Sequence, residues 1–334
     1  MRAATSTNSI FEFRRLSASM VVMAAFFMFA LTQPVAAQSL REIPKYAAIV
    51  IDVDTDEVLY ARNADAARHP ASITKVMTLM LAFDALDAGK IKMTDRVVMS
   101  KHAAAQPPSK LGLGEGGWLS VEEAIRLLAT KSANDVAVAL GEHIAGTELA
   151  FAQKMTEKAR GIGMNATAFY NASGLPNPAH STTARDLGAM SKYLIQQYPH
   201  YYAFFSMQSY NFYGKTYPNH NRLLGKLVGL DGIKTGYTNA SGYTLAASAQ
   251  RDGKRLVAIV LGAPSGAKRN ANIQSLINAG FDVLRQRRFG RTVTVASHMA
   301  EPEQNLTPFN RQIAQGSTDE EEVIEPDYEP TSGE

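Results

Sequence analysis

The segment YTLAASAQRDGKRLVAIVL, from Tyr243 to Leu261, carries the clearest structural signal in the chain. Two runs of β-forming and small apolar residues flank the dipeptide Asp252-Gly253. Asp-Gly between two such runs is one of the strongest short signals for a tight hairpin, because both turn residues adopt positive φ angles readily. We therefore predict an antiparallel pair of strands, at 243–250 and 255–261.

A second hairpin is predicted near the other end of the chain, at 46–52 and 57–62, with residues 53–56 as its turn. About 180 residues separate the two hairpins, and most of that interval has helical periodicity. The economical arrangement is one antiparallel sheet that both chain ends build, with a helical subdomain inserted between them. The predicted fold class is therefore α+β, and a cleft should lie where sheet and subdomain meet.

The inserted interval divides into several helices. Ser120, with Glu123 three residues on, is a capping-box start for a helix that runs towards Lys131. Further helices are predicted at 73–88, 135–145, 148–160 and 183–197, and a last amphipathic helix at 271–284.

The N-terminus has the pattern of an export signal. Arg14 and Arg15 precede an apolar run from Met20 to Leu31, and the small residues up to Ala37 follow it. A membrane-spanning helix needs about 20 apolar residues, so this shorter run indicates a signal peptide that is cleaved after Ala37. Ordinary secretion is favoured over twin-arginine export and over an uncleaved anchor, and the expected location is the periplasm.

The C-terminus has the opposite character. Residues 301–334 contain ten acidic residues and one basic residue, Arg311. Such a segment cannot bury enough apolar surface to fold, and its charge would be repelled by anionic lipid, so we expect no stable membrane anchor. The predicted organisation is a signal peptide at 1–37, a folded domain at 38–290 and a disordered acidic tail at 291–334. Within the domain, the sheet comes from 44–65 and 230–290, and the helical insert is 66–229.

Composition excludes some kinds of chemistry. The chain has no cysteine, which removes disulfides, thiolate nucleophiles and cysteine-based metal sites. The formal charge of the whole chain is +3, so the body that precedes the acidic tail is basic. A basic body suits an acidic polymer, but many solvated surfaces are equally basic, and we expect no nucleic-acid partner.

The candidate chemistry begins at Ser72 and Lys75. On a helix, residues three apart share a face, so Lys75 can take the proton of the Ser72 hydroxyl and make it a nucleophile. The alternative is a helix N-cap at Ser72 with a solvated Lys75. Ser265 and Lys268 repeat the spacing in a glycine-containing loop, where no helix is expected.

Two more motifs follow in a fixed order. Ser132 and Asn134 stand where one helix ends and the next begins, and Lys234-Thr235-Gly236 follows a predicted strand. Either motif alone has a simpler explanation, as a helix cap or as an edge-strand lysine. The ordered set Ser-x-x-Lys, Ser-x-Asn, Lys-Thr-Gly is far more specific than any of its parts.

With these motifs, residues 44–285 resemble the penicillin-recognising serine enzymes, and among them the serine D-Ala-D-Ala carboxypeptidases, or low-molecular-mass penicillin-binding proteins. The resemblance extends along 231–238 and 241–243, and to 171–175 and 180–186. It implies a cleft between an antiparallel sheet and a helical subdomain, where all three motifs meet. It also implies catalysis without a metal or cofactor.

The resemblance implies a role for each motif residue. Ser72 would be acylated, Lys75 would be its general base, and Ser132 would pass a proton to the leaving amino group. Asn134 would hold the peptide amide, Lys234 and Thr235 the terminal carboxylate, and Gly236 would let the strand approach the substrate. The backbone N–H groups of Ser72 and Tyr237 would form the oxyanion hole. Family members often carry an arginine near the carboxylate; here His220 occupies that place with Arg222 nearby, and the contact is left open between them.

The expected activity is removal of the terminal D-alanine from peptidoglycan stem peptides, with β-lactam antibiotics as acylating ligands. A D,D-endopeptidase that cuts cross-links, a class A-like β-lactamase and a non-catalytic penicillin-sensing module remain as alternatives.

Overall fold

The computed structural model describes residues 45–298. At its centre lies a five-stranded antiparallel sheet in the order β2-β1-β9-β8-β7. The strands are β1 (Ala47–Asp52), β2 (Val58–Arg62), β7 (Leu230–Thr238), β8 (Gly242–Arg251) and β9 (Lys254–Ala263). β1 pairs with β9, so the first predicted hairpin joins the last and both ends of the body build one sheet. This part of the prediction is confirmed.

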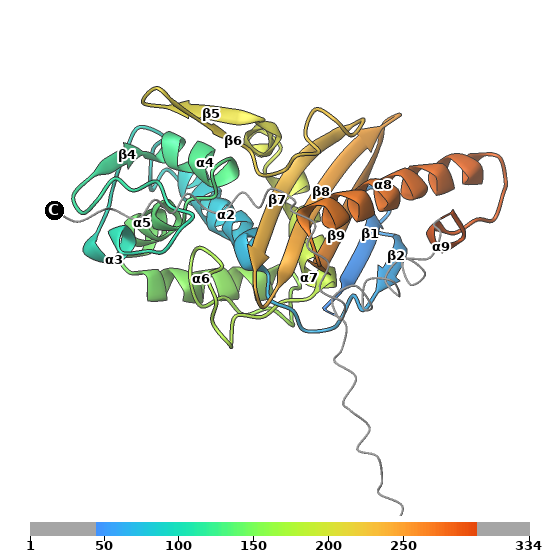
Figure 1. Cartoon of the computed structure of the whole chain (residues 1–334), viewed down its shortest axis with the longest axis horizontal. Helices are drawn as coiled ribbons and strands as arrows, with labels where there is room; N and C mark the ends of the chain where they lie inside the picture. Colours follow the sequence, from blue (N-terminus) through green and yellow to red (C-terminus); the bar gives the residue numbers. More distant parts are fainter. Residues whose placement is uncertain (1–44, 299–334) are drawn as a thin grey trace, which may run out of the picture. The chain divides into compact units, whose positions relative to one another are not determined.

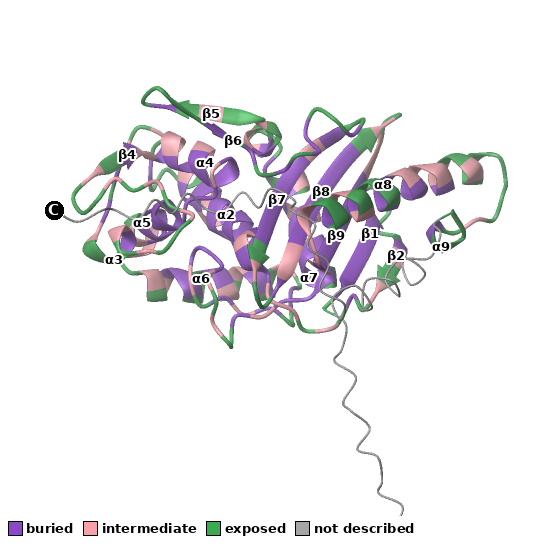
Figure 2. Ribbon diagram, viewed as in Figure 1, coloured by how far each residue is buried: buried purple, intermediate pink, exposed green. Residues whose placement is uncertain are grey.

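Both faces of the sheet are covered, and alternate strand residues enter two different hydrophobic cores. In β9, Val257 and Ile259 belong to one core, whereas Leu256 and Ala258 belong to the other. Helix α8 (Gly266–Arg288) packs on β8 and β9 from one side, where Figure 1 shows it crossing the strands. Because both faces are covered, the inner strands are buried along most of their length, as their purple colour in Figure 2 shows, and their buried residues are mostly apolar.

Helix α7 (Ala184–Gln197) covers the opposite face by packing on β1 and β9. A glycine lies at the close approach on each side of the sheet. A Cβ at Gly188 of α7 would lie 2.6 Å from Ile51, and a Cβ at Gly280 of α8 would lie 2.7 Å from Leu256. Both helices therefore sit so close to the strands that a side chain at either glycine would displace the terminal methyl group of its neighbour.

The inserted subdomain contains the predicted helices. It consists of the 3₁₀ helix η1 (Ala71–Ile73), α2 (Thr74–Asp87), α3 (Lys101–Ala104), α4 (Val121–Ala129), α5 (Asn134–Ala145), α6 (Glu148–Gly161) and the 3₁₀ turn η2 (Tyr202–Ser206). The predicted capping box is present: Glu123 accepts from the Ser120 backbone N–H at 2.7 Å, and Ser120 Oγ accepts from the Glu123 N–H.

The insert at 66–229 is not purely helical, which corrects the prediction. It also holds two hairpins, β3 (Arg96–Val98) with β4 (Trp118–Ser120), and β5 (Ser209–Phe212) with β6 (Lys215–Pro218). The strands of these hairpins have only three or four residues, too few for a periodicity to be read. In addition, α7 lies on the central sheet, because its apolar stripe completes the core under β1 and β9.

The C-terminal boundary also needs correction. Helix α8 begins at Gly266 and continues to Arg288, well beyond the predicted 271–284. The tail was predicted to start at residue 291, yet α9 (Val295–His298) packs on α8 and buries Val295 completely. The predicted signal peptide and residues 299–334 of the predicted tail lie outside the described residues. Between residues 45 and 298, no helix is long and apolar enough to cross a membrane.

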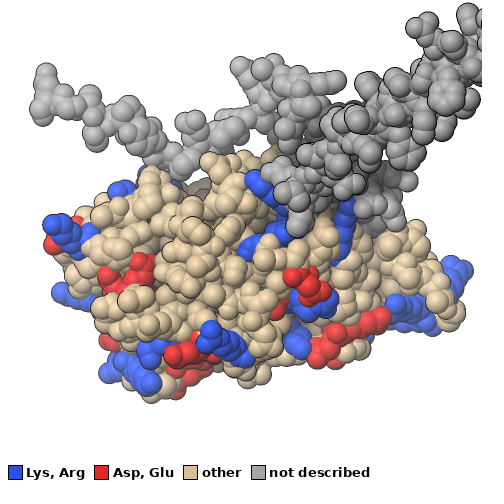
Figure 3. Space-filling view, turned by 90° about the horizontal axis from the view of Figure 1, so that it is seen from below, with Lys and Arg blue, Asp and Glu red and all other residues tan. Residues whose placement is uncertain are grey.

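Charged side chains of both signs are interspersed on the face that Figure 3 shows. The described residues form several exposed ion pairs, such as Arg185 with Asp65 at 2.6 Å and Arg287 with Glu57 at 2.7 Å. Exposed pairs of this kind contribute little to stability, so the two cores, not the surface charges, hold the fold together.

Candidate active site

Ser72 lies in η1, immediately before α2. Its hydroxyl does not cap the helix: the N-cap of α2 is Ile73, which makes no side-chain cap bond. Ala71, just before Ser72, has a positive φ of 48°, an unusual conformation for alanine. The N-cap alternative for Ser72 is therefore wrong, and the chain instead turns sharply to present the half-buried serine between the helical subdomain and β7.

Lys75 is completely buried, which excludes the alternative of a solvated surface lysine. Its Nζ lies 3.0 Å from Ser72 Oγ, 2.8 Å from Asn134 Oδ1 and 2.7 Å from the Ser173 carbonyl oxygen. The last two partners can only accept. A neutral amine has two N–H groups for these two acceptors, which leaves its lone pair for the hydroxyl proton of Ser72.

The electrostatic surroundings favour this neutral form of Lys75. Burial lowers its pKa well below the ordinary value, and the positive charge of Lys234 lowers it further. The carboxylate of Asp135 acts in the opposite direction. Ser72 and Lys75 therefore lie in hydrogen-bond contact, and the surroundings of Lys75 favour the neutral amine that its predicted role as a base requires.

The turn between α4 and α5 brings Ser132 and Asn134 into the same region. The Asn134 oxygen accepts from Lys75 while its Nδ2 donates to the Pro107 carbonyl at 3.0 Å, which fixes the orientation of the amide. Ser132 has a positive φ of 61° and is buried, and its hydroxyl has no hydrogen-bond partner among residues 45–298. Neither side chain caps α5, whose N-cap is Ala133.

Asp135 is a supporting residue that the motif analysis did not identify. Its buried carboxylate accepts from the backbone N–H groups of Leu111 and Gly112 at 2.8–3.0 Å. These bonds tie the loop after α3 to the start of α5, and so hold the turn that contains Ser132 and Asn134.

The Lys234-Thr235-Gly236 motif lies on β7, the edge strand that faces η1. The Lys234 side chain is buried, and its Nζ donates to the Thr235 carbonyl at 3.1 Å. Burial, followed by the positive charge of Arg269, lowers the pKa of Lys234 to about 7. Tyr237 is about half exposed (51%), and its ring packs on Tyr243 with the centroids 4.3 Å apart.

Arg269, at the start of α8, is a second residue that the sequence analysis missed. It is 6% exposed. Among residues 45–298, its guanidinium donates hydrogen bonds only to the side chain of Asn270. Burial lowers the pKa of Arg269 to about 10, and its positive charge in turn lowers the pKa of Lys234. The local sequence does not identify this arginine as a site residue, because only the packing of α8 on the sheet brings it near Lys234.

His220 lies near the same cations, as does Arg222. Enclosure by the surrounding protein and the positive charges of Lys234, Lys131, Lys75 and Arg222 lower the His220 pKa below its usual range. Both His220 and Arg222 are exposed at the surface, so water screens part of this effect. The structure therefore adds Arg269 to the two candidates for a carboxylate contact.

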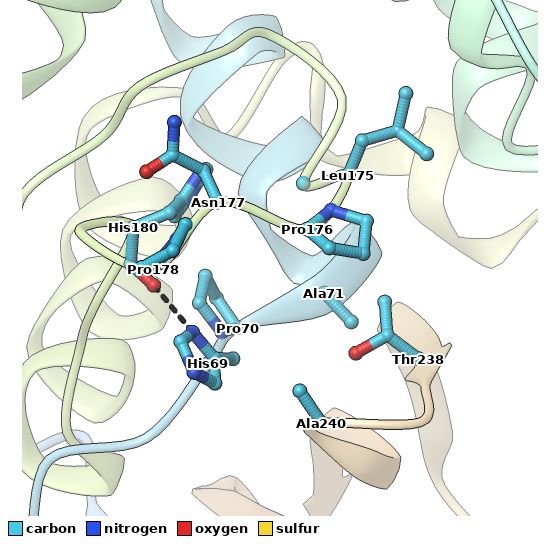
Figure 4. Close-up of a pocket in the computed structure, with 11 residues that line it drawn as sticks. His69, Pro70, Ala71, Leu175, Pro176, Asn177, Pro178, His180, Thr238 and Ala240 are labelled. Atoms are coloured by element: carbon cyan, nitrogen blue, oxygen red, sulfur yellow. Dashed lines mark hydrogen bonds between the residues drawn. The ribbon is translucent and has the colours of Figure 1, made fainter.

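A cavity of about 310 Å³ lies against Pro70 and Ala71, the two residues that precede Ser72 in the chain (Figure 4). Its walls include Pro70 and Ala71 before the serine, Leu175 and Pro176 from a loop, and Thr238 from the end of β7. No lysine, arginine or acidic residue lines it. His180 is kept neutral because burial, followed by the charge of His69, lowers its pKa to about 4. The cavity therefore suits an uncharged group.

The second Ser-x-x-Lys pair, Ser265 and Lys268, is an ordinary helix start. Ser265 Oγ accepts from the Lys268 backbone N–H at 3.1 Å and is the N-cap of α8. The expectation that no helix is present there was wrong, and the N-cap explanation that fails for Ser72 holds for Ser265.

Both the sequence and the fold have relatives among known proteins. A family model described as D-alanyl-D-alanine carboxypeptidase matches residues 33–265. The D-alanyl-D-alanine carboxypeptidase DacF of Bacillus subtilis is 38% identical over 249 residues, which cover 70% of this chain and 61% of that protein. Penicillin binding protein 5 of Haemophilus influenzae has a similar structure, with a TM-score of 0.68 and 33% identity, over 71% of this chain and 70% of that one. Penicillin-Binding Protein D2 of Listeria monocytogenes, solved in a cefotaxime-bound form, has a TM-score of 0.65 and 33% identity, over 70% and 96%.

Proposed function

Because this chain belongs to the D-alanyl-D-alanine carboxypeptidase family, we propose that it removes the C-terminal D-alanine from peptidoglycan stem peptides through an acyl-enzyme on Ser72. The chain spans 61% of the length of its Bacillus relative, so the activity of that relative is a proposal for this chain in all its parts. The observation that carries it is the hydrogen-bond set of Lys75, which fits a neutral amine with its lone pair directed at Ser72.

In the first step, Ser72 Oγ attacks the carbonyl carbon of the penultimate D-alanine, and its proton passes to Lys75 Nζ. The backbone N–H groups of Ser72 and Tyr237 would stabilise the oxyanion. Gly236 supports this arrangement, because β7 approaches η1 so closely that a Cβ at position 236 would lie 2.8 Å from the Ser72 nitrogen.

In the second step, the peptide C–N bond breaks and the leaving amino group of D-alanine needs a proton. The hydroxyl of Ser132, which has no partner among the described residues, is suited to deliver it from Lys75. Water then attacks the ester at Ser72, with its proton going to Lys75, and the serine is regenerated.

The cationic end of the site supports recognition of a free C-terminus. Lys234 and Arg269 are buried, and no acidic partner of either is recorded among residues 45–298, so an incoming carboxylate would compensate their charge. Thr235 would add a hydroxyl contact. Asn134, whose oxygen is shared with Lys75, would hold the peptide amide with its remaining hydrogen-bonding capacity.

The cavity of Figure 4 would receive the acyl side of the substrate, because it lies against the two residues that precede Ser72 and the end of β7. We further propose that β-lactams acylate Ser72, in keeping with the cefotaxime-bound Listeria relative. Export to the periplasm by a signal peptide cleaved after Ala37 completes the proposal.

Product analysis by mass spectrometry tests the reaction. The purified mature protein is incubated with a stem pentapeptide and with a cross-linked muropeptide, and Ser72→Ala is the control. Release of D-alanine from the pentapeptide by the wild-type protein alone supports the proposal. Cleavage of the cross-link alone would establish an endopeptidase instead, and absence of any product would leave a non-catalytic module.

A further inference from the structure

One side chain, Asn171, closes the turn that follows α6. Its Oδ1 accepts from the backbone N–H of Ser173 at 3.2 Å and of Gly174 at 2.7 Å. Its Nδ2 donates to the Leu175 carbonyl at 3.0 Å. An asparagine that bonds its own backbone on both sides fixes the turn much as a backbone hydrogen bond would.

This turn is packed against α2, which carries Lys75, and against η1, which carries Ser72. The Ser173 carbonyl accepts from Lys75 Nζ at 2.7 Å, and the Ala172 carbonyl accepts from Thr78 Oγ1 at 2.6 Å. Gly174, with a φ of +85°, lies so close to η1 that a Cβ there would be 1.9 Å from the Ala71 carbonyl oxygen. The position of the turn therefore determines where the Ser173 carbonyl stands relative to Lys75.

The Ser173 carbonyl has a specific effect on the amine of Lys75. A neutral amine rotates about its Cε–Nζ bond unless both N–H groups have acceptors. Asn134 supplies one acceptor and the Ser173 carbonyl the other, and only with both in place does the lone pair stay directed at the Ser72 hydroxyl.

We propose that Asn171 is a positioning residue for the general base, acting through the Ser173 carbonyl to hold the lone pair of Lys75 towards Ser72. The inference rests on the proposed function, since it concerns the same acylation step. Asn171 does not touch the reacting atoms. It is half-buried, so its replacement does not open a cavity in either core.

The test uses the mature full-length protein and measures the rate of Ser72 acylation by penicillin between pH 5 and 10, with thermal unfolding in parallel. Asn171→Ala frees the turn, and we expect acylation to be about 10- to 100-fold slower at its optimum, as for other small displacements of reacting groups. We expect its unfolding temperature to change little.

Asn171→Asp separates positioning from mere folding. A carboxylate accepts the same two N–H groups and should restore most of the acylation rate at high pH. Its negative charge near Lys75 favours the ammonium form, so the rise of the rate with pH should move to higher pH than in the wild-type protein.

Asn211 offers a matched control. It bridges the β5–β6 turn by accepting from the Gly214 N–H at 3.2 Å and donating to Thr216 Oγ1 at 3.1 Å, and it belongs to none of the three motifs. Asn211→Ala should acylate at the wild-type rate.

Two results would overturn the inference: Asn171→Ala acylating within about twofold of the wild-type rate, or Asn171→Asp showing the same loss as Asn171→Ala with no displacement of the pH profile. A wild-type protein that forms no adduct would instead overturn the proposed function. The role of Asn171 is then decided by NMR of the Lys75 amine, whose hydrogen bond to the Ser173 carbonyl must be weakened in Asn171→Ala and kept in Asn171→Asp.

Discussion

Gly236 of β7 lies directly against the backbone of Ser72: a Cβ at position 236 would come within 2.8 Å of the Ser72 nitrogen, and within 2.9 Å of the Ala71 Cβ. The sheet and the helical subdomain thus meet at Ser72, the proposed nucleophile. This contact brings together two segments that lie more than 160 positions apart in the sequence. It leaves no room for a side chain at position 236.

Gly236→Ala should therefore slow acylation by at least about tenfold, because β7 must move away from Ser72, and the N–H groups of Ser72 and Tyr237 that would stabilise the oxyanion are then drawn apart. Gly161→Ala is the matched control, since a Cβ there meets nothing within 4 Å and the glycine ends α6. Acylation rates of both variants check the prediction, which is wrong if Gly236→Ala reacts like the wild-type protein.

Ser72→Ala should abolish both D-alanine release and labelling by a fluorescent penicillin, because both need the same acyl-enzyme. Ser265→Ala should keep both activities and lose only the cap of α8, at a cost of about 1 kcal/mol in the free energy of unfolding. Gel fluorescence and thermal unfolding measure the two effects. Labelling that persists in Ser72→Ala would assign the nucleophile elsewhere.

The pH dependence of kcat/KM should be bell-shaped. Lys75 must be neutral, so the rate rises as pH increases through its lowered pKa. Lys234 must be charged to bind the substrate carboxylate, so the rate falls as pH increases through its pKa of about 7. The charge of each lysine affects the pKa of the other. The two apparent pKa values of the profile therefore describe the pair of lysines and not either residue alone.

Two changes separate these limbs. A peptide substrate with a C-terminal amide has no carboxylate to pair with Lys234, so its profile should lack the alkaline fall. Lys234→Gln removes a positive charge near Lys75, which raises the Lys75 pKa, and the acid limb should move to higher pH. An acid limb that stays in place would show that Lys75 does not control acylation.

The cavity against Pro70 and Ala71 should prefer an uncharged acyl-side group, because none of its walls offers a charged partner. A D-Ala-D-Ala peptide with an Nε-acetyl-lysine before the first D-alanine should give a higher kcat/KM than the free lysine, by about tenfold for one unpaired buried charge. Asn177→Asp, which adds an acid to the wall, should reduce this preference. Equal kcat/KM values for both peptides would contradict the cavity assignment.

A penicilloyl adduct on Ser72 should persist for minutes or longer, while peptide turnover is faster. A β-lactamase needs a dedicated base for the deacylating water, and three acidic residues between Asn134 and Lys234 are engaged elsewhere. Glu148 accepts a hydrogen bond from the Ala172 N–H and contacts His102. Asp186 accepts from the Thr167 hydroxyl, and Asp231, in β7, is paired with Arg255 of β9. Intact-mass measurement after mixing with excess penicillin tests this. Rapid multiple turnover without an adduct would favour a β-lactamase.

The arrangement of the sheet could be predicted from the sequence because its signals are local. Asp252-Gly253 forms the expected turn, with positive φ at both residues, and the strands on either side pair as expected. The short strands of β5 and β6 were missed, because four residues are too few to show a period of two. The packing of α7 on the sheet was missed because helical periodicity indicates that a face is buried, without indicating against what.

The motif residues Ser72, Lys75, Asn134 and Lys234 were identified from the sequence because their chemistry is tied to their spacing and order. Only the tertiary structure placed the Ser173 carbonyl on Lys75, Arg269 near Lys234, and Gly236 against the Ser72 nitrogen. A backbone carbonyl has no letter in the sequence, and an arginine at the start of α8 looks like any surface cation until the sheet folds. The residue types determined which chemical groups the sequence could supply. The lowered pKa of Lys75, in contrast, was decided by burial and by charges that long-range packing brings together.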